Sequence, residues 1–147
     1  MNSKGTQLRL FAALVSLALI AAFSAHAQQA APNDPNTWLV AAQRAAQMID
    51  QNKAGELWEG GSAEMKQRVA KKEFIASMKK LRGADTVTAR EWVAIEHAQL
   101  AAGAGMPQGH YVNVRFRAAL GKRVVTEMVT FRQEADGGWR WMGYVAQ

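Results

Sequence analysis

The sequence predicts an α+β domain in which three or four N-terminal helices pack on a curved, four-stranded antiparallel sheet. Apolar residues recur at helical spacing over residues 35–82, and after Gly83 the period changes to alternation. Turns containing Gly121 and Gly137 separate the alternating stretches. Because such a sheet has one apolar face, we expect the helices to cover that face and to leave a cone with one open end.

The first 27 residues have the features of a secretory signal peptide. Lys4 and Arg9 precede an apolar run over residues 10–23, and the small residues Ala25 and Ala27 form a cleavage pattern. The run is shorter than the about 20 apolar residues that span a bilayer, so cleavage is favoured over a membrane anchor.

Cleavage after the signal would make Gln28 the first residue of a periplasmic or secreted protein. Residues 28–33 are small and polar and are predicted to be a flexible tether, and residues 34–147 a single domain. The net charge of +6 falls to +4 without the two basic residues of the signal. Nucleic acid is not expected as a partner, because the protein is predicted to be exported. The chain has no cysteine, which excludes a lipoprotein anchor and disulfide bonds.

The helical half is predicted to contain helices at residues 35–52, 54–59, 63–69 and 71–82. Asp34 is expected to cap the first of them, with Pro35 at its first position, and Ser62 to cap the third. In the fourth, apolar residues gather on one side: Phe74, Ile75, Met78 and Leu81. Basic residues in and before this helix are expected to form a solvated face: Arg68, Lys71, Lys72, Lys79, Lys80 and Arg82.

The second half is predicted to form strands at residues 92–98, 111–117, 124–132 and 139–145, with an irregular glycine-rich loop at residues 101–109. Alternation sends Trp139 and Trp141 to the same face of the sheet. Core packing is the favoured role for these two side chains, whereas a solvent-facing position would favour stacking on a ligand.

Glu127 breaks the apolar pattern of its strand. It shares a predicted face with Val125 and Val129, where an unpaired carboxylate is costly. Either that face is solvated, or the carboxylate has a partner that neutralises it or donates a hydrogen bond. The candidates for this partner are Arg90, Arg115, Arg117, Tyr111 and Tyr144.

Little in the sequence supports a metal site, a cofactor site or a nucleophilic serine. The mature chain has two histidines, His97 and His110, and Glu96 beside His97 lacks the spacing of a helical zinc motif, so we expect no metal and no cofactor. Ser62 is expected at a helix start rather than at the sharp strand-to-helix turn of a nucleophilic serine.

The order and spacing of several segments resemble an exported bacterial family called domain of unknown function 4019. The segments are Arg82-Gly83, Arg90, Gly109-His110-Tyr111-Val112, Phe116, Glu127-Met128-Val129-Thr130, Asp136-Gly137-Gly138-Trp139-Arg140 and Gly143-Tyr144. The resemblance implies a helices-on-bent-sheet fold, similar to the nuclear-transport-factor-2-like and cystatin-like classes. It implies no activity.

Two hypotheses about function follow. The first is a non-enzymatic envelope protein that binds a small apolar ligand, a peptide or another protein. Its candidate binding residues are Arg90, Arg115, Trp139 and Trp141. The second is a small cone-fold enzyme of the isomerase, dehydratase or hydrolase kind, with Glu127 as base and Tyr111 or Tyr144 as proton donor. A bidentate arginine on Glu127 would argue against the enzyme.

A homodimer is also expected, because the open edge strands of such a sheet can pair between two subunits.

Overall fold

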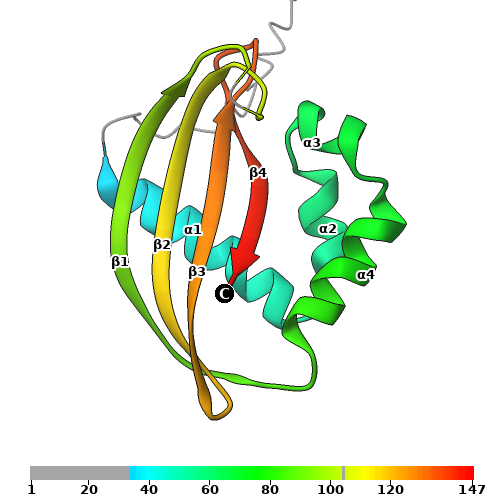
Figure 1. Cartoon of the computed structure of the whole chain (residues 1–147), viewed down its shortest axis with the longest axis vertical. Coiled ribbons are helices and arrows are strands. Elements are labelled where there is room, and N and C mark those ends of the chain that lie inside the picture. The colour runs from blue at the N-terminus through cyan, green and yellow to red at the C-terminus, as the bar shows by residue number, and fades with distance from the viewer. Residues whose placement is uncertain (1–33, 104) are drawn as a thin grey trace, which may run out of the picture.

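The computed structural model describes residues 34–103 and 105–147, so the predicted signal peptide, its cleavage site and the tether lie outside the described residues. Four helices precede four strands in the described part of the chain (Figure 1). They are α1 (Pro35–Asp50), α2 (Ala54–Glu59), α3 (Ala63–Arg68), α4 (Lys71–Arg82), β1 (Val87–Leu100), β2 (Gly109–Leu120), β3 (Arg123–Gln133) and β4 (Trp139–Ala146). The predicted α+β class and order of elements are confirmed.

The helix boundaries depend on caps that the sequence predicts. The side chain of Asp34 accepts a hydrogen bond from the backbone N–H of Asn36, and Ser62 Oγ accepts one from Glu64. Gly83 ends α4 with a φ of 61°, a left-handed conformation that glycine adopts without strain. None of the described helices is long and apolar enough to span a bilayer.

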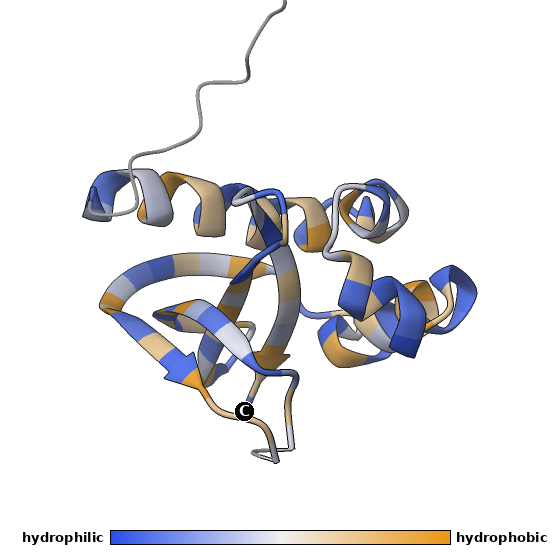
Figure 2. Ribbon diagram, turned by 90° about the horizontal axis from the view of Figure 1, so that it is seen from above, coloured by the Kyte–Doolittle hydropathy of each residue, from blue (hydrophilic) through white to orange (hydrophobic). Residues whose placement is uncertain are grey.

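The sheet is antiparallel throughout, in the order β1-β2-β3-β4, and it is not closed into a barrel. It curves strongly, with α1 lying across one face and α2, α3 and α4 beside the β4 edge (Figures 1 and 2). β1 starts at Val87 rather than at the predicted Trp92, because its first residues pair with the end of β2 around Leu120.

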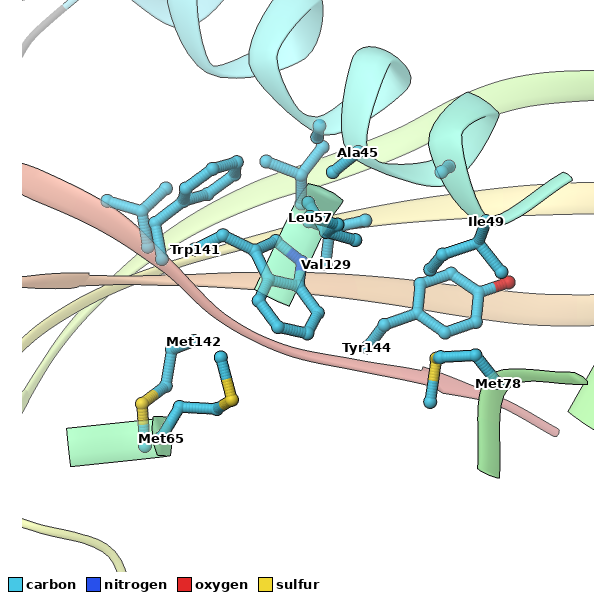
Figure 3. Packing of buried hydrophobic residues seen from close by; sticks show 14 of the residues in the cluster. Ala45, Ile49, Leu57, Met65, Met78, Val129, Trp141, Met142 and Tyr144 are labelled. Atoms are coloured by element: carbon cyan, nitrogen blue, oxygen red, sulfur yellow. The ribbon is translucent and has the colours of Figure 1, made fainter. Parts of the chain in front are cut away.

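The core lies between α1 and this face of the sheet. Trp38, Ala42 and Ile49 form its helical side, and Figure 3 shows Ile49 beside Tyr144. The opposing strand residues Val112, Val114, Phe116 and Val129 are fully buried. Hydrophobic burial of this kind supplies the main favourable term in folding. The middle of the curved face is therefore filled with side chains of the protein itself.

Both strand tryptophans of β4 pack inward, as alternation predicts. Trp141 is buried and meets Phe74 of α4 edge-on at 5.1 Å between ring centroids. Trp139 is half-buried and meets Trp38 of α1 edge-on at 4.9 Å. These contacts join both helical layers to the last strand.

The two edges of the sheet differ. Along β4, the backbone N–H of Ser62 donates to the carbonyl of Trp141, and Gly61 forms a bridge with the same residue, so the α2–α3 connection covers that edge. On β1, Trp92 and Val93 sit at an irregularity in the pairing with β2, and 55% of each is exposed. The expected homodimer stays a prediction, and β1 is the more open edge for it.

Two predictions about α4 are wrong. Ile75, expected in the core, is 39% exposed because it lies at the rim of the helical layer, over Gly55. Arg82, expected on the solvated face, is only 7% exposed. Its side chain belongs to the site that follows.

Candidate functional site

Glu127 is fully buried on the helix-facing side of the sheet. Its register partners, Phe116 on β2 and Ala146 on β4, share this face. The prediction that Glu127 points inward is confirmed, and the alternative that its face is solvated is wrong. A buried carboxylate must then be satisfied by its neighbours.

Two arginines and one tyrosine satisfy the carboxylate. Arg90 donates from Nε to Glu127 Oε2 at 2.5 Å and from Nη2 to Oε1 at 3.1 Å. Arg82 Nη1 donates to Oε1 at 2.8 Å, and the hydroxyl of Tyr144 donates to the same oxygen at 2.6 Å. Charged hydrogen bonds of this geometry are the strong ones in proteins, so the carboxylate is held on both oxygens.

Asp50, at the end of α1, completes the charge balance. Its carboxylate lies 2.6 Å from Nη2 of Arg82 and 3.0 Å from Nη2 of Arg90. Two arginines thus face two carboxylates, and their formal charges cancel. We call the group of Asp50, Arg82, Arg90, Glu127 and Tyr144 the ionic cluster; one residue comes from each of α1, α4, β1, β3 and β4.

The electrostatics of the ionic cluster keep Glu127 ionised. Burial alone raises the pKa of the carboxyl, but the hydrogen bonds from Arg90, Tyr144 and Arg82 outweigh it and hold that pKa below its ordinary value. Burial, together with the bond to Glu127, raises the pKa of Tyr144 well above its ordinary value. At neutral pH the buried carboxylate is ionised and accepts hydrogen bonds on both oxygens, and the phenol of Tyr144 donates to it. Neither group is poised to exchange a proton with a substrate.

The other predicted partners of Glu127 lie elsewhere. Arg115 and Arg117 flank Phe116 on β2 and so point to the opposite face, where Arg115 pairs with Glu96 at 2.6 Å. The hydroxyl of Tyr111 donates to the carbonyl of Pro107 at 2.6 Å. Of the five candidate partners, Arg90 and Tyr144 contact Glu127.

Sequence reasoning missed Asp50 and Arg82, although their spacing carries a signal. Arg82 follows Phe74 and Met78 at intervals of four on α4, which places all three on the buried face of that helix. Asp50 follows Ala42 and Ala46 on α1 in the same way. A charged residue at the end of a buried stripe is a candidate for a buried ion pair.

A pocket lies at the opposite end of the same sheet face, where β1 ends and β2 begins. Its volume is about 390 Å³. We call it the end pocket; it is lined by His97, Ala98, Gln99, His110, Tyr111, Gln133 and Trp139. Here Gln99 pairs in register with His110, and Gln133 with Trp139. Among the candidate binding residues, Trp139 is at this pocket, whereas Arg90 is in the ionic cluster, Arg115 is on the outer face and Trp141 is in the core.

The end pocket presents polar groups beside aromatic rings. The ring of His97 meets that of Trp38 edge-on at 6.2 Å between centroids, and Trp139 packs against the same Trp38. Gln133 donates from Nε2 to the carbonyl of Gly137 at 3.2 Å, within the turn that leads to β4. The described residues contain no group of three or more His, Cys, Asp or Glu side chains placed to hold a metal ion.

Comparison with known proteins identifies the family. No curated protein matches the chain. The family described as "Protein of unknown function (DUF4019)" matches residues 41–144, a region that contains the whole ionic cluster and the whole end pocket. Because the match covers more than half of the chain, this protein belongs to that family.

Proposed function

We propose that this protein is a non-enzymatic binding domain that works in the bacterial envelope after export. The observation that carries this proposal is the complete burial of Glu127 among side chains that donate to both of its oxygens. A general base needs a free lone pair within reach of a substrate proton. Glu127 instead accepts four hydrogen bonds from three side chains and is fully buried.

The competing hypothesis of a cone-fold enzyme depended on the same residue. A bidentate arginine is the arrangement that argues against it, and Arg90 contacts both oxygens of Glu127. The tyrosine within reach, Tyr144, serves the carboxylate rather than an open cavity. The geometry therefore favours binding over catalysis.

The end pocket is the site we propose for a small ligand. The middle of the curved face is packed with fully buried residues such as Val112 and Phe116 and has no room for a ligand. The end pocket instead combines imidazole and amide groups with an aromatic wall from Trp139. Pockets that pair apolar walls with a few polar groups are typical ligand sites.

Export is supported by the first 27 residues alone. Their basic start, apolar run and Ala25-His26-Ala27 ending have the order of a secretory signal. N-terminal sequencing of protein recovered from the periplasm should begin at Gln28. A retained Met1 would contradict export with cleavage.

Binding can be tested with protein recovered from the periplasm. Small molecules that remain associated after purification would be released by denaturation and identified by mass spectrometry. We expect them in the wild type and in Thr126→Ala, which changes an exposed residue of β3, and expect their loss in a Gln99→Ala/His110→Ala double variant. Equal recovery from the double variant, or no bound molecule in any sample, would contradict the proposal.

A further inference from the structure

Two histidines that are separate in sequence come together in the end pocket. The chain has three histidines, and His26 falls within the predicted signal peptide. The remaining two, His97 on β1 and His110 on β2, both line the pocket. No lining residue is Lys, Arg, Asp or Glu, so imidazole is the strongest metal-binding group that the described pocket offers.

The strand register places both imidazoles on one face. His97 pairs with Val112 and His110 pairs with Gln99, so the histidines are diagonal neighbours on adjacent antiparallel strands. Such neighbours stand roughly 7–8 Å apart between backbone positions. Each imidazole nitrogen binds a metal at about 2.0 Å, and two side chains at this separation can reach one ion between them.

The surroundings hold one of the two rings in place. The T-shaped contact with Trp38, itself buried and packed on Trp139, restricts the orientation of the His97 ring. Gln99, directly opposite His110 in the register, places an amide oxygen on the same face as a third donor. Water would complete the coordination, which leaves the ion open to a further ligand.

We propose that the end pocket binds one late first-row divalent cation, with His97 and His110 as its protein ligands. Cu²⁺ is the tightest occupant in this class, followed by Ni²⁺ or Zn²⁺, since imidazole suits these ions and Cu²⁺ tops the divalent affinity order. Mg²⁺ and Ca²⁺ are not expected, because they prefer carboxylate and carbonyl oxygens. This inference rests on the proposed binding function and names the ligand class of the same pocket. It replaces the expectation of no metal, because the pairing of β1 with β2 brings His97 and His110 together.

The test is a Cu²⁺ titration of the untagged, EDTA-treated, full-length exported protein, followed by tryptophan fluorescence. Bound Cu²⁺ quenches nearby indoles, and Trp38 and Trp139 adjoin the two histidines. We expect saturable quenching with one ion per chain. Each of His97→Ala and His110→Ala should weaken the apparent affinity at least tenfold, whereas Thr126→Ala should leave it unchanged.

A gain-of-function variant tests the same geometry. Gln99→His places a third imidazole opposite His110, and we expect it to tighten Cu²⁺ and Zn²⁺ binding at least tenfold in calorimetry. Circular dichroism would confirm that each variant is folded, which is expected because both histidines and Gln99 are exposed.

The outcomes separate this inference from the proposed function. Unchanged Cu²⁺ affinity in both histidine variants would overturn the metal site. An organic molecule that stays in the EDTA-treated wild type and is lost from the Gln99→Ala/His110→Ala variant would also overturn it, but would leave the binding function standing. The absence of both kinds of ligand would overturn both.

Discussion

The two ends of the helix-facing side of the sheet differ in how their polar side chains are paired. At one end, the ionic cluster buries two arginines, two carboxylates and a phenol that serve one another. At the other, the end pocket leaves His97, Gln99 and His110 exposed. Buried charges must be paired within the protein, whereas exposed polar groups are free for water or a ligand. The first end is therefore closed to other molecules, and the second is the end where we propose binding.

The ionic cluster also connects the fold. Its members come from α1, α4, β1, β3 and β4, and Glu127 in β3 is the residue that three of the others contact. Burying such a group gives little net stability, but removing one partner leaves the others buried and unpaired. Substitutions in the ionic cluster and in the end pocket should therefore lower the free energy of unfolding by different amounts.

The largest effect is expected for Glu127→Ala, which leaves the two buried arginines, Arg82 and Arg90, with Asp50 as their one remaining carboxylate in the ionic cluster. We expect a loss of about 3–5 kcal/mol in the free energy of unfolding, measured by urea denaturation. The matched control is Glu96→Ala, which breaks the exposed pair with Arg115 and should cost less than about 1 kcal/mol. Equal losses in the two variants would contradict the distinction between a buried and an exposed ion pair.

Low pH should remove the contribution of Glu127 to the free energy of unfolding. The pKa of Glu127 is below its ordinary value of 4.5 in the folded protein, so its stabilising effect is present above pH 4.5 and is lost as the pH falls through the folded pKa. Urea titrations from pH 7 to pH 2 should show the wild type approaching Glu127→Gln as the pH decreases. A constant difference between the two at all pH values would show that ionisation of this carboxyl is not the cause.

At the end pocket, only the aromatic wall should affect stability strongly. Trp139→Ala removes the edge-on contact with Trp38 and should cost about 3 kcal/mol, near the lower end for a core tryptophan because the side chain is half-buried. Thermal denaturation would measure the change. An unaltered melting temperature would identify Trp139 as a surface residue and would favour ligand stacking as its role.

The smallest effect is expected for His110→Ala. Its side chain is exposed at the end pocket, so the free energy of unfolding should change by no more than about 0.5 kcal/mol. Urea denaturation of both His110→Ala and Glu127→Ala would compare the contributions of the end pocket and the ionic cluster to the free energy of unfolding. A loss comparable to that of Glu127→Ala would mean that the end pocket is part of the structural core.

Local patterns in the sequence were sufficient for most of the fold. The spacing of apolar residues predicted α2 and α4 to the residue, and the Asp34 and Ser62 caps were correctly placed. Alternation along β3 was sufficient to place Glu127 among apolar neighbours. These features depend on contacts within a helix turn or between alternate residues of a strand, and such contacts are encoded locally.

The sequence by itself determined that Glu127 shares a strand face with Val125 and Val129, but only the tertiary structure decided that this face is buried and which partners the carboxylate has. Arg82 reaches Glu127, and Asp50 reaches Arg82, because α1 and α4 end close together above the sheet, while Arg115 is excluded by the pleat of β2. The approach of His97 to His110 depends likewise on the register between two strands. Period and spacing define the face of a residue within its own element, whereas the curvature of the sheet and the docking of the helices define which faces meet.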